Sequence, residues 1–165
     1  MTPDTAKALI GFLSESLRRE QAVTLKVLQA VPEDHLDYKP AEKSTSALDL
    51  AWHLASAEVA LVIGAATGEF KFAPKPAGIK AAADVVAWYK EHSGAAQKAA
   101  ATMTVDQATK VLDPFGGMPL PGIAFLNLAI NHAIHHRGQL SSYLRPMGGK
   151  VPAIYGGSAD EPFKA

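Results

Sequence analysis

The chain has 165 residues, its 16 lysines and arginines balance 16 aspartates and glutamates, and it contains no cysteine. This length predicts a single domain, 1–165, with a full hydrophobic core, and the unclustered charge indicates neither nucleic acid nor an anionic membrane as a partner. Without cysteine, a disulfide, a thiolate metal ligand and a cysteine nucleophile are excluded, so thiol chemistry would need a thiol cosubstrate. The start, MTPDTAKALI, is no signal peptide, and no apolar stretch reaches the 18 or so residues of a membrane span, so we expect a cytoplasmic protein.

The first helix is predicted from Pro3 to about Ala30. Thr2 is a favourable cap, Pro3 suits the first turn, and Val31-Pro32 stops the helix. Glu20 lies on the apolar arc of this helix. Its carboxylate therefore points either inward, as a candidate catalytic group, or along its own stem to solvent.

After a polar connection, 32–43, a second helix is predicted from the Ser46 cap through Ala66, because Ser46 and Asp49 have capping-box spacing. His53 follows Asp49 by one turn. The arc around His53 has mostly small side chains, which leave room for an ion and a ligand; its members are Leu50, Ala57, Ala60, Leu61 and Gly64. Asp49 either only caps the helix or, as a second candidate catalytic group, also orients the imidazole of His53.

Glycine and proline breaks predict that residues 67–80 form a long crossover connection. A third helix follows from about Ala81 to Ala101 and places His92 on its core-facing arc. We interpret His92 as a buried imidazole with its hydrogen bonds satisfied, and the alternative is a ligand or pocket role. Residues 102–120, with Asp-Pro and Gly-Gly pairs, predict a loop.

The central helix is predicted from Pro121, which suits a first helical position, to the Arg145-Pro146 pair. His132 and His136 lie one turn apart, so both rings can bind one metal ion, and both fall within an apolar stripe. The plainer alternative is that both are core imidazoles bonded to a carbonyl or carboxylate.

Other residues of this helix have roles that the helical wheel leaves open. A shift in helix phase would let His135 replace His136 as a ligand, although His135 lies off the main arc. Gln139 is placed to touch the pocket or a bound water, and Arg137 is expected at solvent or at an interface. An apolar band wider than one bundle face predicts a homodimer; its members are Leu126, Ile130, Ile134 and Leu144. Residues from about 147 form a glycine- and proline-rich tail that Tyr155 anchors to the bundle.

Together these elements predict an all-α fold, a four-helix bundle with one long crossover between its second and third helices. In such bundles, sites form from side chains on facing helices, so His53, His132 and His136 are expected to converge. Three neutral imidazoles leave coordination positions open, as in catalytic rather than structural sites.

Three segments, Trp52-His53-Leu54, HAIHHRGQL (132–140) and VPAIYG (151–156), resemble the DinB family of bacterial metalloenzyme-like proteins. The resemblance implies an up-down-down-up four-helix bundle, commonly a homodimer, with a divalent ion, nickel or zinc, held by His53, His132 and His136. Relatives of the family include thiol S-transferases and a mycothiol-dependent isomerase. The resemblance does not imply DNA binding.

Two main classes of function follow. The first is a metal-dependent enzyme in which the ion activates a water or a low-molecular-weight thiol for reaction with a small-molecule substrate, with thiol transfer preferred and hydrolysis the nearest competitor. The second is a metal-binding or small-molecule-binding protein without turnover. A third, purely structural interpretation treats the histidines as buried hydrogen-bonding groups.

Overall fold

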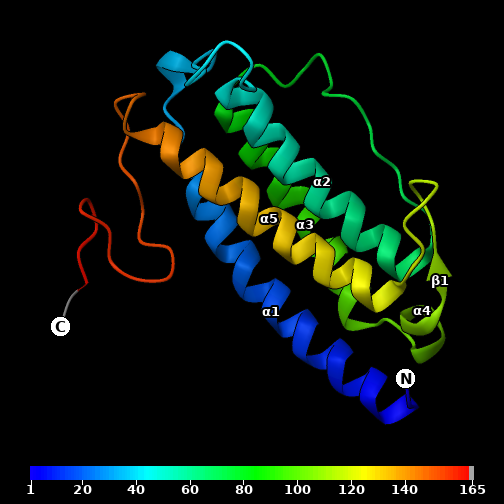
Figure 1. Cartoon of the computed structure of the whole chain (residues 1–165). Coiled ribbons are helices and arrows are strands. Elements are labelled where there is room, and N and C mark those ends of the chain that lie inside the picture. The colour runs from blue at the N-terminus through cyan, green and yellow to red at the C-terminus, as the bar shows by residue number, and fades with distance from the viewer. Residues whose placement is uncertain (164–165) are drawn as a thin grey trace.

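The computed structural model describes residues 1–163, so the last two residues of the predicted domain lie outside the described part. Four long helices lie side by side in Figure 1: α1 (Pro3–Gln29), α2 (Ala47–Thr67), α3 (Ala82–Ala101) and α5 (Gly122–Leu144). Two short helices, η1 (Glu33–His35) and α4 (Val105–Thr109), and two strands, β1 (Val111–Leu112) and β2 (Leu120–Pro121), complete the described elements. The predicted all-α class is confirmed.

The long helices share their contacts unevenly. The most extensive contact is between α2 and α5, and α3 packs on both α2 and α1. Because α1 also packs on α5, α1 and α2 occupy diagonal positions. The connection of residues 68–81 runs along the outside of α2, from its C-terminal end back to the level where α3 begins (Figure 1). It therefore covers one face of α2.

The helix ends follow the local signals in the sequence. The Thr2 hydroxyl accepts a hydrogen bond from the Thr5 N–H at 3.2 Å, and the Ser46 hydroxyl accepts one from the Asp49 N–H at 3.2 Å. Gly68 ends α2 with a φ of 84°, a left-handed conformation that glycine adopts without strain. The three predicted boundaries therefore agree with the structure to within one or two residues.

Residues 102–120 differ from the predicted loop, since they contain α4 and the antiparallel pair β1–β2. Thr104 and Gln107 form a capping box at the start of α4, a local signal that the prediction overlooked. Pro121 is the N-cap of α5 rather than its first helical residue. The helix starts at Gly122, where a Cβ would lie 2.4 Å from the Gln107 carbonyl oxygen and 2.8 Å from that of Ala65.

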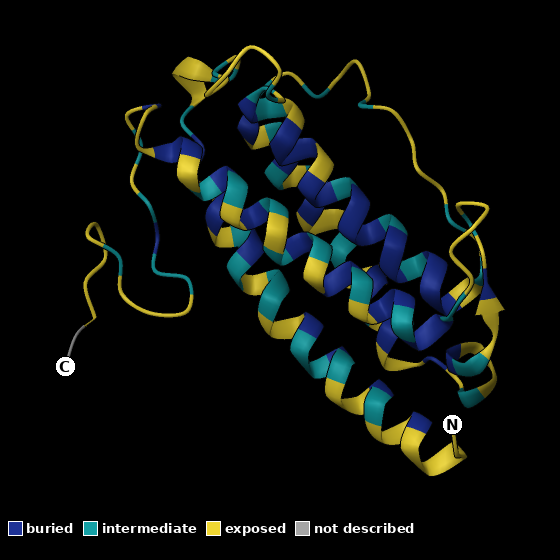
Figure 2. Ribbon diagram, in the orientation of Figure 1, coloured by how far each residue is buried: buried dark blue, intermediate teal, exposed yellow. Residues whose placement is uncertain are grey.

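Helix α2 also corrects the expectation that no segment matches a membrane span. By length and composition alone, α2 meets that description, but 72% of its apolar window is buried inside the protein. Figure 2 shows α2 as mostly buried, whereas α1 alternates between buried and exposed residues. Burial on this scale is the pattern of a core helix.

The apolar band of α5 that suggested a homodimer is used inside the chain. Leu126, Ile130 and Leu144 are all buried, with at most 4% exposure, and Ile134 is half-buried. Most of this band is therefore covered within the chain, and only Ile134 keeps part of its surface exposed. The homodimer remains a prediction that rests on the family resemblance.

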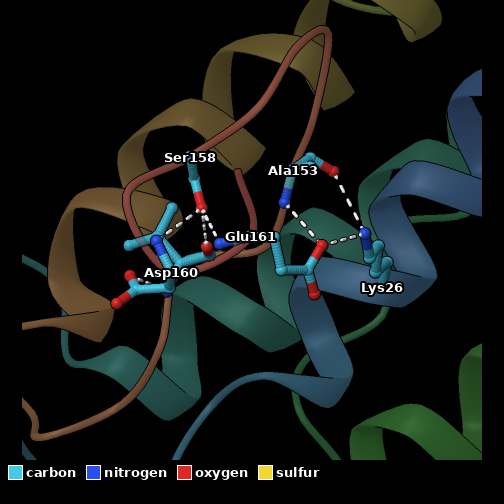
Figure 3. A network of polar contacts seen from close by, with 6 residues as sticks. Lys26, Ala153, Ser158, Asp160 and Glu161 are labelled. Atoms are coloured by element: carbon cyan, nitrogen blue, oxygen red, sulfur yellow. Dashed lines mark hydrogen bonds and ion pairs between the residues drawn. The ribbon is translucent and has the colours of Figure 1, made fainter. Parts of the chain in front are cut away.

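The C-terminal tail is held against α1 by polar contacts (Figure 3). The Glu161 carboxylate pairs with Lys26 at 2.5 Å and accepts a hydrogen bond from the Ala153 N–H at 3.0 Å. The Ser158 hydroxyl accepts hydrogen bonds from the N–H groups of Asp160 and Glu161. The tail thus follows a defined path beside the bundle.

Candidate metal centre

Three histidines from α2 and α5 come together at one place. His53, His132 and His136 each offer a ring nitrogen, and these nitrogens lie within 4.8 Å of one another. The Nε2 atoms of His53 and His136 are 3.2 Å apart. Two nitrogens bound to one ion at about 2.0–2.1 Å, with an angle between about 90° and 110°, would lie about 2.9–3.4 Å apart. We call these three residues the histidine cluster.

The histidine cluster lies at the edge of the core, not inside it. His53 is exposed, and His132 and His136 are half-buried, so the predicted inward position is wrong for His53. The fully buried positions of α5 include Ala129, Ala133 and Arg137. The centre of the buried face of α5 therefore lies next to His132 and His136 rather than on them. Because apolar residues occupy both sides of the helix, the sequence pattern alone did not distinguish these orientations.

All three imidazoles are favoured in the neutral form. Burial lowers the pKa of His53 and of His136, and burial together with the neighbouring histidines lowers the pKa of His132 to about 4. A neutral imidazole keeps one nitrogen lone pair free for a metal ion.

Hydrogen bonds around the cluster are consistent with a ligand role. The Nδ1 of His136 lies 3.1 Å from the Gln139 amide oxygen, which accepts a hydrogen bond from the Nδ1–H group. Nε2 of His136 then keeps the lone pair. Gln139 therefore contacts a histidine of the cluster, near the place predicted for it. The Nδ1 of His132 is buried and has no hydrogen-bond partner within residues 1–163. An orphaned nitrogen in a set of three neutral imidazoles fits a site for a divalent metal ion.

The two carboxylates proposed as catalytic groups lie elsewhere. The Glu20 carboxylate does point inward, but it pairs with Arg137 at 2.6 Å and accepts a hydrogen bond from the Tyr155 hydroxyl at 2.7 Å. Asp49 binds the Ser46 hydroxyl at 2.7 Å and Lys75 at 2.5 Å. In the described part of the chain neither carboxylate bonds to a histidine of the cluster. Ser46 is the N-cap of α2, and the Asp49 carboxylate accepts a hydrogen bond from its hydroxyl.

The two remaining uncertain histidines are also placed. The His92 Nδ1 lies 2.7 Å from the Trp88 carbonyl oxygen, and its ring stacks on the Trp88 ring with centroids 4.1 Å apart. The hydrogen bond matches the interpretation of a satisfied imidazole, but His92 is half-buried rather than buried. His135 is exposed, with its ring centroid 4.8 Å from that of His136, and it lies outside the cluster.

A cavity of about 910 Å³ adjoins the cluster, between α2 and the crossover. His53 and His132 line it, as do Ala57 and Ala60, in keeping with the predicted room beside His53. Gly64 does not, because the Phe70 ring fills its space: a Cβ there would lie 2.3 Å from a ring carbon. The cavity is in the size range of small-molecule sites, and its largely apolar wall suits one.

Sequence reasoning missed a second polar cluster, inside the bundle. Arg137, expected at solvent or an interface, is 1% exposed, and its guanidinium also binds the Glu20 carbonyl oxygen at 3.1 Å and the Tyr155 hydroxyl at 2.5 Å. Glu58 is fully buried and accepts a hydrogen bond from the Tyr89 hydroxyl at 2.6 Å. We call Glu20, Glu58, Tyr89 and Arg137 the buried polar layer, and Tyr155, which is 68% exposed, contacts it from the tail. Tyr155 anchors the tail, as predicted.

Burial raises the pKa of Glu58 to about 7, although contacts with Tyr89, Gln21 and Arg137 oppose the rise. Its second oxygen, Oε2, has no hydrogen-bond partner in the described residues, which adds to the cost of ionising it. One signal for Glu58 was available, since it is the only aspartate, glutamate, lysine or arginine between positions 50 and 67. A lone carboxylate in so apolar a helix indicates a specific buried partner.

Comparison with known proteins identifies the family. A model of the DinB family matches residues 5–162. The chain belongs to the DinB family. Within the family, it is 32% identical over 128 residues to the Bacillus subtilis protein YjoA, covering 76% of this chain and 82% of YjoA. It is 26% identical over 143 residues to YrdA of the same species, covering 86% and 85%.

Two crystal structures of DinB-like proteins have similar folds. The structure of YjoA superimposes with a TM-score of 0.68 at 27% identity, covering 92% of this chain and 95% of YjoA. A DinB-like protein from Bacillus cereus superimposes with a TM-score of 0.70 at 30% identity, covering 87% and 95%. The fold of this DinB-family chain therefore extends over nearly the whole length of both proteins.

Proposed function

We propose that this DinB-family protein binds one divalent ion, nickel or zinc, through His53, His132 and His136, and uses it to transfer a low-molecular-weight thiol to a small electrophilic substrate. The observation that carries the proposal is the convergence of three neutral imidazoles, with ring nitrogens within 4.8 Å, beside a cavity of about 910 Å³. The supporting fold is, we propose, an up-down-down-up bundle of α1, α2, α3 and α5.

The protein's own part in this function is to hold the ion and to orient the histidines that bind it. His132 and His136 contribute from successive turns of α5, and His53 contributes from α2, so the site depends on the packing of these two helices. Gln139 selects the tautomer of His136 that leaves Nε2 free. When bound, a divalent ion supplies a Lewis acid that lowers the pKa of a coordinated thiol or water.

The surroundings of the histidine cluster favour a thiol over water as the nucleophile. Attack by water benefits from a general base within hydrogen-bond reach, but Glu20 and Asp49 are both engaged elsewhere. A thiol needs less help, because its pKa is already near 8.5 and metal coordination deprotonates it outright. Since the chain has no cysteine, the thiol would arrive as a cosubstrate. A homodimer and a cytoplasmic location complete the proposal.

Metal binding is tested first, by titrating the chelator-treated protein with Zn²⁺ and Ni²⁺ in a calorimeter. We expect one equivalent to bind the natural sequence and His132→Ala to abolish that binding. His135→Ala is the matched control, since His135 lies on the same helix outside the cluster, and it should bind normally. A full equivalent at unchanged affinity in His132→Ala would refute the assignment.

The chemistry is tested by incubating the metal-loaded protein with an electrophilic substrate, with and without bacterial thiols. We expect a product that contains the thiol and that is lost in His53→Ala but not in His135→Ala. Turnover that requires metal but ignores the thiol would make the protein a hydrolase. No turnover across a broad substrate panel would leave a metal-binding protein without activity.

A further inference from the structure

The cavity beside the histidine cluster is elongated. It follows α2 from the turn that carries His53 to the last turn, where Thr67 lines it, and the crossover lines its other side. The fourteen residue steps from His53 to Thr67 span about 21 Å of helix axis, at about 1.5 Å per residue. A ligand that fills the cavity is therefore long rather than round.

The end of the cavity away from the histidines is aromatic. Phe72 from the crossover and Phe115 from the loop between β1 and β2 both line it, with ring centroids 5.9 Å apart. Each of these side chains is 51% exposed. When an apolar molecule binds there, it removes these exposed apolar side chains from water, which lowers the free energy of the complex.

The histidine end of the cavity has polar and charged side chains beside its apolar ones. Lys75 lines it from the crossover, and its ammonium group pairs with Asp49, one turn before His53. A histidine binds a metal ion as a neutral imidazole, so a divalent ion held by the histidine cluster would keep its full positive charge at this end. The Lys75–Asp49 pair at this end, at 2.5 Å, and the Lys71–Glu69 pair at the aromatic end, at 2.9 Å, each largely cancel, so the two ends differ in charge by the bound ion.

From this polarity we infer that the cavity binds an elongated apolar molecule with one anionic head group, the apolar body lying against Phe72 and Phe115 and the head at the histidine cluster beside Lys75. The inference rests on the proposed function, because it names the substrate class of the same site. It does not depend on turnover.

The protein carries its own reporters for a binding test. It has two tryptophans, Trp52 and Trp88, and both line the cavity. We would titrate the protein with 2-bromoundecanoate, whose bromine lies next to the head group and quenches tryptophan fluorescence at close contact, at concentrations below those at which it forms micelles. The neutral alcohol 2-bromoundecan-1-ol is the matched probe for the head group. Saturable quenching is expected, at least about tenfold tighter for the carboxylate than for the alcohol in metal-loaded protein.

Two variants test the place of binding. Phe115→Ser removes half-exposed apolar surface and should weaken the binding of both probes at least about fivefold. Ala60→Phe fills the cavity from a half-buried position on α2 and should abolish saturable quenching. The control is Phe12→Ser, because Phe12 is 71% exposed on α1 and does not line the cavity. Lys75→Met should weaken the binding of the carboxylate probe and leave the binding of the alcohol probe unchanged.

Failure of this inference is distinguishable from failure of the proposed function, because metal content is measured on the same samples. Metal binding without saturable quenching, equal effects of Phe115→Ser and Phe12→Ser, or equal affinity for the two probes would each overturn the inference. If the natural sequence takes up no metal but still prefers the carboxylate in a manner that depends on Phe115 and Lys75, the inference stands and the proposed metal chemistry fails.

Discussion

Helices α2 and α5 build two polar clusters with opposite properties. The histidine cluster lies at the edge of the bundle, with one exposed and two half-buried rings, and one of its buried nitrogens has no partner in residues 1–163. In the buried polar layer, Arg137 and Glu58 are at most 1% exposed, and the Arg137 guanidinium has three partners in Glu20 and Tyr155. The two clusters meet on α5, where His136 and Arg137 are consecutive.

This difference separates polar residues that hold the fold from those that are free to bind. Arg137 uses its donors inside the protein. Removing it would leave the Glu20 carboxylate without its charged partner, which would lower the stability of the fold. In the histidine cluster, by contrast, Nδ1 of His132 has no hydrogen-bond partner in residues 1–163, and His53 and His132 line a cavity. We therefore expect changes in the buried polar layer to lower stability and changes at the histidine cluster to lower ligand affinity.

The largest effect is expected for Arg137→Met, which should lower the free energy of unfolding by about 3–5 kcal/mol because Glu20 loses its buried partner. Urea unfolding of the metal-free protein measures this. The control is Arg145→Met, since the Arg145–Asp160 pair is largely exposed, with 54% and 26% side-chain exposure, and its loss should cost less than about 1 kcal/mol. Equal losses would show that the buried polar layer is not a structural element.

The next effect concerns pH and Glu58, which Tyr89, Gln21, Thr24 and Arg137 face from the other three long helices. The pKa of Glu58 rises from an ordinary 4.5 to about 7, so the folded protein binds the extra proton between these values and stability falls as pH rises through them. Glu58→Gln has no such proton. Its stability relative to the natural sequence should increase by about 3 kcal/mol from pH 4 to pH 8, as judged by urea unfolding across that range. A constant difference would contradict the raised pKa.

At the histidine cluster, Gln139→Leu should lower metal affinity by about 10-fold to 100-fold, because His136 loses the hydrogen bond that selects its tautomer. Calorimetric titration with Zn²⁺ measures the change, and the stability of the metal-free protein should hardly move. Asn131→Leu, at an exposed position of the same helix, serves as the control. If both variants bind equally well, Gln139 does not support the site.

The smallest effect is expected for Tyr155→Phe, which removes one hydroxyl that contacts both Arg137 and Glu20. Unfolding free energy should fall by about 1 kcal/mol. Tyr38→Phe provides the comparison, since the Tyr38 hydroxyl makes no hydrogen bond within the described residues, and it should change stability by only a few tenths of a kcal/mol. No difference between the two would show that the Tyr155 hydroxyl does not support the buried polar layer.

The sequence by itself determined the features that depend on near neighbours along the chain. The caps at Thr2 and Ser46, the stop at Val31-Pro32 and the crossover after Gly68 act within a few residues, so the long helices were predicted nearly to the residue. The i, i+4 spacing of His132 and His136 is local in the same sense, because it follows from the helical period alone.

Only the tertiary structure decided how α2 and α5 are rotated about their axes. Both helices carry apolar residues on several sides, so the wheel allowed more than one buried arc, and packing selected the arc that buries Arg137 and Glu58 and leaves His53 exposed. The cavity was also beyond prediction, because its walls come from residues as distant as Trp52 and His132. Their proximity is a property of helix packing, since no local preference acts across eighty residues of chain.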